Sequence, residues 1–557
     1  MRAKCLRNVA MLAVACGMAA TSGGLRAQNR GGDDSQTKTP IKHVVVIFQE
    51  NVSFDHYFGT YPHAANLPDE TPFHPKDDTP RTDNLLSAGL LEFNPNGVNP
   101  FRIPPKFAVT CDEDHNYGDE QFAFHAGLMD RFTATLPSGS AFSCKDVNLG
   151  SNSVMGYYDG NTATALWNYA QYFAMSDNSF GTTFGPSTPG AVNLISGNTF
   201  GATLVPARPN GTTASASGNI ANAANTGAVI GDPRPGWDDC VLTNPGLATT
   251  NMVTVTGKNV GDLLNAKGLT WGWFQGGFAP TGTQMRTDEF GVTRAVAVCA
   301  SHHTGLAGDD AVTTVGDYIP HHEPFEYYSQ SSNIQHLPPS SPHMIGSTDQ
   351  ANHQYDLADF FVALREGRLP AVTFLKAAAY QDGHAGYSSP LDEQIFLVNT
   401  INTLMRSDEW KETAVIISYD DSDGWYDHVM GPIVNQSSVT DDQLLGAGNC
   451  GTPKPSNTGG VTQNGRCGYG PRLPLIVISP WARKNYVDHR VTDQSSILRF
   501  IEDNWNLGRI GNGSTDAIAG TLDGMFDFDD KRKGDDKHSG KLILNPDTGH
   551  ILDDDSR

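Results

Sequence analysis

The sequence predicts an α/β fold, a three-layer α/β/α sandwich with a mainly parallel central sheet. Two observations predict it. Short continuous runs of apolar residues, bounded by polar residues or proline, are typical of strands buried on both faces. Segments with helical periodicity lie between these runs, and such an alternation favours a parallel sheet covered by helices.

Four apolar runs are the predicted strands. They are HVVVIF (43–48), AVTFLK (371–376), TAVIISY (413–419) and LPLIVISP (473–480). Valine and isoleucine dominate them, without strict alternation of apolar and polar residues. We therefore expect these strands to lie in the interior of the sheet.

Three segments carry helical signals. Residues 356–367 end in glycine, with Pro370 beyond it, which is a typical helix stop. Residues 389–407 have apolar residues at helical spacing and acidic residues in the first turn, where the helix dipole favours them. Residues 493–505 show a similar pattern.

The 557 residues would suit two or three domains by length alone. We instead expect one catalytic domain over residues 28–557, with two insertions. Residues 198–232 are rich in Gly, Ala, Asn and Thr and predict an exposed excursion. Residues 444–471 form the second insertion, and the charged tail from Asp527 is expected to be peripheral.

Residues 1–27 resemble a secretory signal peptide. Three basic residues precede a short apolar core, and small residues lead to a cleavage position after Ala27. The core is too short to span a bilayer, and no later apolar run of about 18 residues predicts a transmembrane segment. Without an Arg-Arg pair, Sec-type export to the periplasm or medium is expected. A lipoprotein with Cys16 as its acceptor is the alternative.

Six cysteines follow the signal peptide. An even number in an oxidising compartment favours disulfides, and none of the six has the spacing of a zinc site. We predict sequential pairing: Cys111–Cys144, Cys240–Cys299 and Cys450–Cys467. The last pair would close the second insertion.

The formal net charge of −23 argues against two classes of partner. Sequence-independent binding of nucleic acid needs a basic surface. Adsorption to anionic lipid needs one as well.

Two predicted strands end on polar side chains. HVVVIFQ leads into Glu50 and Asn51, and TAVIISY leads into Asp420 and Asp421. Reacting groups collect at the carboxyl ends of parallel strands, and three carboxylates meeting there would repel one another unless a cation is bound. Oxygen ligands of this kind suit a hard divalent ion. Simple capping of the following turns is the alternative.

A candidate nucleophile lies in the segment FGPSTPGAVNLISG (184–197). Pro189 suits the first turn of a helix, which would place Ser187 just before the helix N-terminus, where an anion is favoured. A metal-bound hydroxyl there would lose its proton readily and attack an ester. An ordinary N-cap is the alternative role of Ser187, and Thr188 is the rival nucleophile.

Three histidines stand in polar loops. They are His115 in CDEDHNYGDE, His322 in YIPHHEPFEYY and His384 in QDGHAGYSSP. Loop histidines can donate to phosphate oxygens or protonate a leaving group, although each alone would suit an ordinary structural role. His428, in GWYDHV, is a weaker candidate.

Six segments together resemble the bacterial phosphoesterase family of acid phosphatases and phospholipases C. They are ENVSFDHYFG (50–59), DEDHNYGDE (112–120), FGPSTPG (184–190), HHEPFEYY (321–328), QDGHAGYSSPLDEQ (381–394) and YDDSDGWYDHV (419–429). They follow the order of the family from residue 41 to about residue 505. The resemblance implies an alkaline-phosphatase-like fold.

The resemblance also implies roles for the candidate residues. Glu50, Asn51, Asp420 and Asp421 match the ligands of a divalent metal, which could be Ca, Mg, Mn or Zn. Ser187 matches a nucleophile that forms a phosphoenzyme. The histidines that match phosphate-binding and leaving-group groups are His115, His322 and His384.

Two residues of this sequence differ from the residues that are common at the matching positions of the family. Arg is common where this chain has Val52, and Asn is common where it has Gly190. We expect Gly190 to alter how the leaving group is held.

The predicted substrate is a phosphate ester, most simply a phosphomonoester cleaved by an acid phosphatase with a mildly acidic optimum. Phospholipase C, acting on phospholipid, is the alternative. Relatives that favour phosphocholine often carry an additional C-terminal β-rich region, whereas only residues 506–557 follow the last predicted helix here. A sulfatase lacks support, because the nucleophile segment has no C/S-x-P-x-R pattern. A calcium-stabilised secreted binding protein is the non-enzyme alternative.

Overall fold

The computed structural model describes residues 36–135, 150–205, 218–221, 226–243, 251–287, 292–306, 316–444, 450, 463–529 and 540–552. The predicted signal peptide, residues 1–27, lies outside these ranges, so export stays a prediction. Within the described residues, no helix is both long and apolar enough to cross a membrane.

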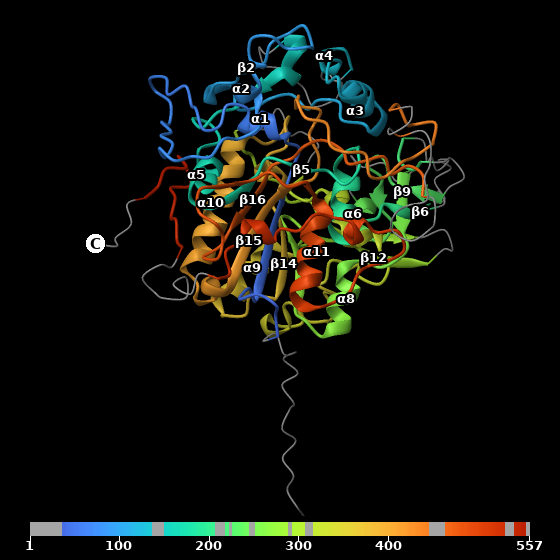
Figure 1. Cartoon of the computed structure of the whole chain (residues 1–557). Coiled ribbons are helices and arrows are strands. Elements are labelled where there is room, and N and C mark those ends of the chain that lie inside the picture. Colours follow the sequence, from blue (N-terminus) through green and yellow to red (C-terminus); the bar gives the residue numbers. More distant parts are fainter. Residues whose placement is uncertain are drawn as a thin grey trace, which may run out of the picture.

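An eight-stranded sheet forms the centre of the molecule (Figure 1). Its strand order is β13-β10-β14-β1-β15-β16-β4-β17. β16 is antiparallel to both neighbours, and the other adjacent pairs are parallel. The strands are β1 (His43–Gln49), β4 (Ala174–Ser176), β10 (Trp271–Gln275), β13 (Gln354–Asp356), β14 (Val372–Lys376), β15 (Thr413–Tyr419), β16 (Leu475–Ile478) and β17 (Tyr486–Asp488).

Helices lie on both sides of this sheet, which confirms the predicted α/β sandwich. In Figure 1, α5, α9 and α10 lie on one side and α6, α8 and α11 on the other. The described helices are α1 (Phe54–Phe58), α2 (Leu85–Ala88), α3 (Tyr117–Phe124), α4 (Phe132–Thr135), α5 (Thr164–Tyr172), α6 (Ser187–Ser196), α7 (Asp239–Thr243), α8 (Val260–Lys267), α9 (Leu357–Arg365), α10 (Pro390–Arg406) and α11 (Gln494–Trp505).

The caps of three helices explain the accuracy of their predicted bounds. The side chains of Asp356, Ser389 and Asp493 each accept a backbone hydrogen bond at the start of α9, α10 and α11. Such caps satisfy backbone N–H groups that have no partner within the helix. Capping residues and apolar periodicity therefore define these helices in the sequence.

The central strands are buried completely, because helices cover both faces of the sheet. All seven residues of β15 are buried, as are six of the seven residues of β1. Burial on both faces explains why these sequences are continuously apolar.

Elements α1 to α4 and β2 (Phe101–Arg102) cover the end of the sheet at which β1 finishes, at the top of Figure 1. This end carries the polar residues that follow the strands. β2 pairs with β3 (Gly156–Tyr157), and β5 (Ser179–Phe180) pairs with β18 (Thr492–Asp493).

The first insertion is not simply an exposed excursion. Its described ends contain β6 (Phe200–Leu204) and β7 (Thr226–Ala228), which join β8 (Arg234–Pro235) and β9 (Met252–Val255) in a second sheet. Ala202 and Ala228 are buried there. The prediction of exposure is wrong for these parts, because small residues hide a strand signal that larger apolar residues would show.

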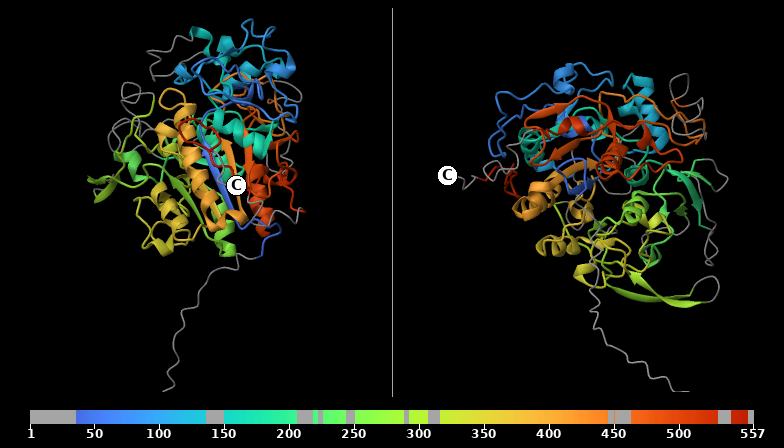
Figure 2. Two further views of the ribbon diagram at one scale, coloured as in Figure 1. Left: turned by 90° about the vertical axis from the view of Figure 1, so that its left-hand side faces the viewer. Right: turned by 60° about the horizontal axis from the view of Figure 1, so that its bottom comes forward.

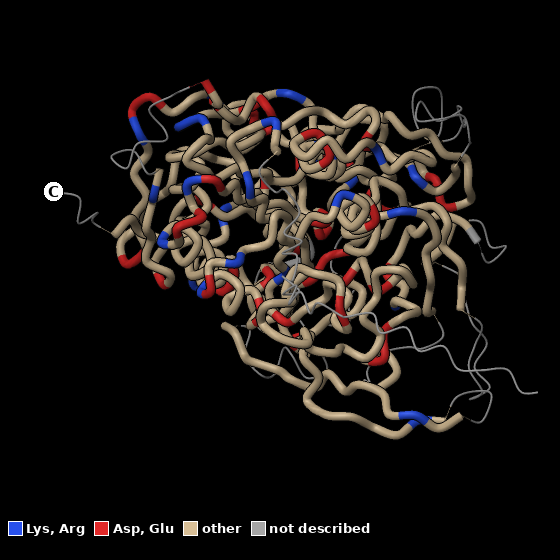
Figure 3. Tube along the Cα trace, turned by 90° about the horizontal axis from the view of Figure 1, so that it is seen from below, with Lys and Arg blue, Asp and Glu red and all other residues tan. Residues whose placement is uncertain are grey.

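A hairpin of β11 (Gly282–Thr287) and β12 (Thr293–Val298) extends from one side of the molecule (Figure 2). On the side drawn in Figure 3, Lys and Arg are interspersed with Asp and Glu along the described chain. No basic stripe is visible on that side among those residues.

Two of the predicted disulfides are present, and the third cannot be compared. Cys240 is bonded to Cys299, with their Cα atoms 5.5 Å apart, and Cys450 is bonded to Cys467, with their Cα atoms 5.6 Å apart. Cys144 lies outside the described residues, so its pairing with Cys111 stays a prediction.

Candidate active site

The strand register brings the two predicted acidic strand ends together. β1 pairs in parallel with β15, with Gln49 opposite Tyr419. The residues that follow, Glu50-Asn51 and Asp420-Asp421, therefore leave the sheet side by side. All four are buried, with exposed fractions of 3% or less.

Ser187 lies between these two strand ends. It is the first residue of α6, after the N-cap Pro186, and Pro189 stands in the first turn as predicted. Its Oγ lies 3.2 Å from Glu50 Oε2 and 3.1 Å from Asp421 Oδ2. We call Ser187, Glu50, Asn51, Asp420 and Asp421 the Ser187 site.

Backbone hydrogen bonds orient the carboxylates of this site. Asp420 Oδ1 accepts from the backbone N–H groups of Asn51 (2.9 Å) and Asp421 (2.8 Å). Asp421 Oδ1 accepts from the backbone N–H of Asp423 at 2.7 Å. The second oxygens of these two carboxylates, Asp420 Oδ2 and Asp421 Oδ2, take no part in these backbone hydrogen bonds.

Two oxygen atoms of the Ser187 site are buried without a hydrogen-bond partner among the described residues. They are Asn51 Oδ1 and Asp420 Oδ2. A buried polar atom without a partner costs about 1–3 kcal/mol, so such atoms are rare unless a ligand satisfies them.

The charges of the Ser187 site are poorly balanced. Burial and the neighbouring charge of Asp420 raise the pKa of Glu50 well above its usual range, and the Lys376 ammonium offsets them only in part. Burial and Asp420 likewise raise the pKa of Asp421. An added cation would relieve this repulsion, so the donor set fits a hard divalent ion.

Lys376 is a site residue that the sequence interpretation missed. It ends β14, the strand on the other side of β1, and its Nζ makes a very close contact with Glu50 Oε1. Burial opposes its charge, but Glu50, Asp420 and Asp382 together raise its pKa. A charged lysine as the last residue of a buried strand is the signal that the sequence offers.

His322 lies beside Glu50, as predicted for a site histidine. Its Nδ1 is 3.2 Å from Glu50 Oε1 and 4.0 Å from Asp382 Oδ2. Nε2 is buried without a hydrogen-bond partner among the described residues. Burial, followed by the neighbouring His321 and Lys376, lowers the pKa of His322 well below its ordinary value.

His115 reaches the site from the segment before α3. Its Nδ1 lies 2.7 Å from the carbonyl oxygen of Glu113, and its Nε2 lies 3.4 Å from Asn51 Nδ2. Burial opposes its charged form, but Asp421, Asp423 and Asp112 together raise its pKa well above the ordinary value.

His384 lies next to His115, with their ring centroids 6.5 Å apart. Its Nδ1 lies 2.6 Å from the carbonyl oxygen of Ala385, and its ring stacks on Tyr387. Burial lowers its pKa below the ordinary value. The structure thus gathers all three predicted histidines around the Ser187 site.

The side chain of Thr188 contacts different groups from those that the side chain of Ser187 contacts. Asp232 Oδ1 accepts hydrogen bonds from both the backbone N–H and the Oγ1 of Thr188, each at 2.9 Å. Tyr327 Oη lies 3.4 Å from the same Oγ1. Of the two hydroxyls, that of Ser187 is therefore the one that faces the acidic strand ends.

Gly190 has a packing role that the sequence interpretation missed. A Cβ atom there would lie 2.2 Å from the carbonyl oxygen of Asp420. Glycine therefore allows α6 to approach the end of β15 closely. The expected effect of Gly190 on the leaving group stays a prediction.

His428, the weaker candidate, belongs to a different cluster. Its Nδ1 is 2.5 Å from Asp55 Oδ2, and the Arg472 guanidinium contacts both Asp55 and Asp427. We call Asp55, Asp427, His428 and Arg472 the Arg472 cluster. The contacts of His428 are made with this cluster and Asp83, not with the Ser187 site.

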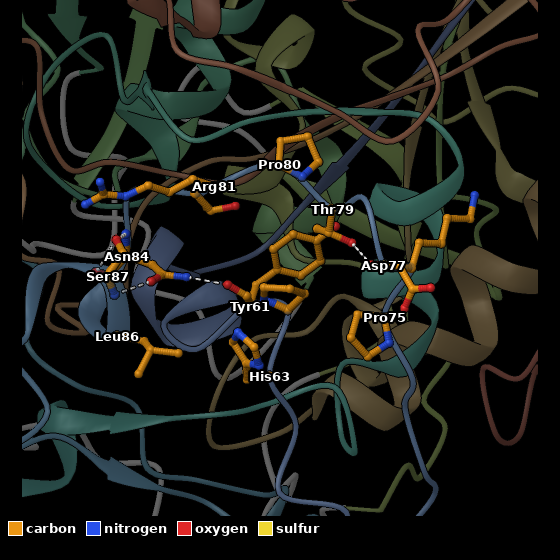
Figure 4. A pocket seen from close by; sticks show the side chains of 13 residues that line it. Tyr61, His63, Pro75, Asp77, Thr79, Pro80, Arg81, Asn84, Leu86 and Ser87 are labelled. Atoms are coloured by element: carbon orange, nitrogen blue, oxygen red, sulfur yellow. Dashed lines mark hydrogen bonds between the residues drawn. The ribbon is translucent and has the colours of Figure 1, made fainter.

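A cavity of about 520 Å³ lies elsewhere in the described structure. Figure 4 shows its walls, which include Tyr61, Pro75, Pro80, Arg81 and Leu86. None of the predicted site residues lines it.

A family model matches most of the chain. The model of the Phosphoesterase family matches residues 41–508, which includes every residue of the Ser187 site. Solved structures give only a distant likeness. A protein of the alkaline phosphatase superfamily from Vibrio parahaemolyticus is 11% identical, with a TM-score of 0.29, and the match covers 67% of this chain and 66% of that chain.

Curated relatives bear phospholipase C names. Non-hemolytic phospholipase C of Burkholderia pseudomallei is 25% identical over 84% of this chain and 55% of that protein. Phospholipase C B of Mycobacterium tuberculosis (H37Rv) is 24% identical over 88% of this chain and 78% of that protein. The chain thus spans about half the length of the first relative. The family match covers most of the chain, and the protein belongs to the Phosphoesterase family.

Proposed function

We propose that this protein hydrolyses phosphoric esters through a phosphoserine formed on Ser187. One observation carries the proposal. The Ser187 hydroxyl lies at the start of α6 between Glu50 Oε2 and Asp421 Oδ2, in a site where two buried oxygens have no partner among the described residues. Family membership supports the same reaction class.

Glu50, Asn51, Asp420 and Asp421 would hold the divalent ion. Bound there, the ion would supply Lewis-acid stabilisation of negative charge and favour loss of the Ser187 proton. Asn51 Oδ1 and Asp420 Oδ2 offer ligand atoms that no described residue uses. The ligand chemistry leaves Ca, Mg, Mn and Zn open.

The first chemical step transfers the phosphoryl group to the protein. The Oγ of Ser187, having lost its proton, attacks phosphorus in line, so that an Oγ–P bond forms as the bond to the alcohol oxygen breaks. In the second step, water attacks the phosphoserine, the Oγ–P bond breaks, and inorganic phosphate leaves. Ser187 regains its proton. The N-terminus of α6 favours the phosphate in both steps.

The three histidines would divide two tasks. His115 is surrounded by carboxylates that favour its charged form, so it is suited to protonate the departing alcohol. His322 and His384 have lowered pKa values, so each ring is neutral and carries a single N–H group. In His384 that group is on Nδ1 and donates to the carbonyl oxygen of Ala385, so its Nε2 would accept a proton from the attacking water. Positioning and charge stabilisation, rather than covalent help, should supply most of the acceleration.

We propose phosphomonoesters as the substrate, as in acid phosphatases. Lys376 and His322 contact Glu50, and His115 contacts Asn51. Together with a bound divalent ion, these groups would match a monoester dianion better than a phosphodiester monoanion. A phospholipase C is the second candidate, because several relatives bear that name.

Substitution at the two neighbouring hydroxyls tests the proposal. Ser187→Ala should lower turnover of p-nitrophenyl phosphate by about 10³-fold or more, because it removes the nucleophile. Thr188→Val is the matched control. It should keep most of the turnover of p-nitrophenyl phosphate, because the Ser187 hydroxyl is intact. Nearly unchanged turnover in Ser187→Ala would refute the phosphoserine route.

A substrate panel tests the finer proposal. Wild-type protein should hydrolyse p-nitrophenyl phosphate with a higher kcat/KM than p-nitrophenylphosphorylcholine or phosphatidylcholine. The reverse order would establish the phospholipase C alternative.

A further inference from the structure

Arg234 lies close to the Ser187 site, although it follows the first insertion in the sequence. It begins β8, two residues after Asp232, whose carboxylate holds Thr188 at the start of α6. The chain that returns from the second sheet thus brings a guanidinium group near the residue next to Ser187.

Arg234 connects to the site through a pair of histidines. Its Nη1 makes a very close contact with His321 Nδ1. His321 packs edge-on against His322, with ring centroids 4.4 Å apart, and His322 lies 3.2 Å from Glu50. The contacts of His321 and His322 therefore link the Arg234 guanidinium to Glu50, one of the predicted metal ligands.

The contact with His321 requires a neutral imidazole that accepts at Nδ1. Burial, followed by the charge of Arg234, lowers the pKa of His321 well below its ordinary value. With Nδ1 accepting, the hydrogen of the neutral ring is on Nε2, which can donate to an anion.

The guanidinium retains hydrogen-bonding capacity. Its Nε is buried and has no hydrogen-bond partner among the described residues. Asp232 influences its charge, but Asp232 Oδ1 already accepts twice from Thr188. Lys376, in contrast, is committed to Glu50. An arginine presents its N–H groups in a planar fork that matches phosphate oxygens.

We propose that Arg234 binds the non-reacting oxygens of the substrate phosphate and makes the site selective for phosphomonoesters over phosphodiesters. This inference rests on the proposed hydrolysis at Ser187 and deepens it by naming a specificity-determining residue. A monoester dianion carries one more negative charge than a diester and has three non-bridging oxygens instead of two. A fixed guanidinium therefore gains more from the monoester.

The test compares two substrates in two variants. Arg234→Gln should lower kcat/KM for p-nitrophenyl phosphate by about 10- to 150-fold, the range expected for a lost charge-assisted hydrogen bond, and for bis(p-nitrophenyl) phosphate by less than about 5-fold. Arg234→Lys keeps the charge but not the fork, so its losses should be intermediate. The ratio of the two kcat/KM values is the readout.

A binding measurement separates recognition from turnover. In a Ser187→Ala background, Arg234→Gln should weaken calorimetric binding of inorganic phosphate by at least about 10-fold. Arg294→Gln is the matched control, because Arg294 pairs with Asp239 and is 37% exposed, and it should change neither the kcat/KM ratio nor phosphate binding.

The outcomes distinguish this inference from the proposed function. Equal losses on both substrates, or unchanged phosphate binding, would overturn the role of Arg234. If wild-type protein fails to hydrolyse p-nitrophenyl phosphate, the monoester proposal fails instead. The phosphate titration still decides whether Arg234 binds phosphate. If Arg234→Gln does not fold, the same comparisons with Arg234→Lys decide the question.

Discussion

The Ser187 site and the Arg472 cluster are built from the same kinds of side chain, yet they differ in how their oxygens are used. Both gather buried carboxylates and a nearby histidine. In the Arg472 cluster every carboxylate oxygen of Asp55 and Asp427 has a partner, supplied by Arg472, His428 or backbone N–H groups. In the Ser187 site, Asp420 Oδ2 and Asn51 Oδ1 have none among the described residues.

The difference separates a structural cluster from a ligand site. Buried charges that are paired within the protein maintain the fold, and removal of one partner leaves the other uncompensated. In the Ser187 site the unpartnered oxygens belong to a group of buried acids that also holds the Ser187 hydroxyl, and this combination favours a bound cation. Acids and histidines in a sequence therefore do not by themselves distinguish a ligand site from a structural cluster. The hydrogen-bond partners of their buried oxygens distinguish the two better.

Substitution of a proposed metal ligand should have the largest effect on activity. We expect Asp420→Asn to lower kcat by about 10³-fold, because metal ions contribute several kcal/mol of transition-state stabilisation. The same change removes a negative charge from a crowded site, so the metal-free protein should unfold at an equal or higher temperature. Steady-state kinetics and thermal melts of metal-stripped protein measure both effects. A large fall in melting temperature would mean that Asp420 is structural.

The Arg472 cluster should respond in the opposite way. Arg472→Met should destabilise the protein by about 3–5 kcal/mol, because it leaves Asp427 buried without its cation and Asp55 with His428 alone. The folded fraction should retain most of its kcat, since no ion pair or hydrogen bond among the described residues joins the cluster to Ser187. Urea unfolding measures the first effect, and kinetics at low temperature the second. A variant as stable as wild type would show that the pairing contributes little.

A smaller effect should depend on pH. Burial opposes the charge of His428, but Asp55 raises its pKa to about 10, above the ordinary value of 6.5. A raised pKa in the folded state contributes stability that is fully present below about pH 6.5 and is lost as pH rises toward 10.

The variant His428→Gln removes this contribution. It should be less stable than wild type by about 1.5–3 kcal/mol at pH 6, the range for a hydrogen bond to a charged group. The difference should shrink steadily between pH 6.5 and pH 10 in urea unfolding. A difference that does not change over this range would contradict a charged His428.

Much of the fold could be predicted from the sequence, because local signals define it. The four predicted strands correspond to β1, β14, β15 and β16, and the three predicted helices to α9, α10 and α11. The antiparallel direction of β16 depends on the chain path outside the strand, which apolar runs do not encode. Short strands such as β4 and β17 have only three residues and give too little pattern.

Polar motifs after strands, in loops and before a helix predicted the candidate site residues, whereas Lys376, Asp232 and Arg234 were missed. Glu50 and Asp420 follow continuous apolar runs, so a common sheet edge was predictable. Lys376 was assigned to the predicted strand 371–376, and its charge was not interpreted as part of the site. Arg234 and Asp232 reach the site through the return path of the first insertion, and only tertiary structure reveals that path.

The most direct test of the comparison is a calorimetric titration of the metal-stripped protein with Mn²⁺. We predict saturable binding to wild type, at least about 100-fold weaker binding to Asp420→Asn, and wild-type binding to His428→Gln. This pattern would assign the ion to the Ser187 site. Unchanged binding to Asp420→Asn, or equal weakening in both variants, would contradict the account.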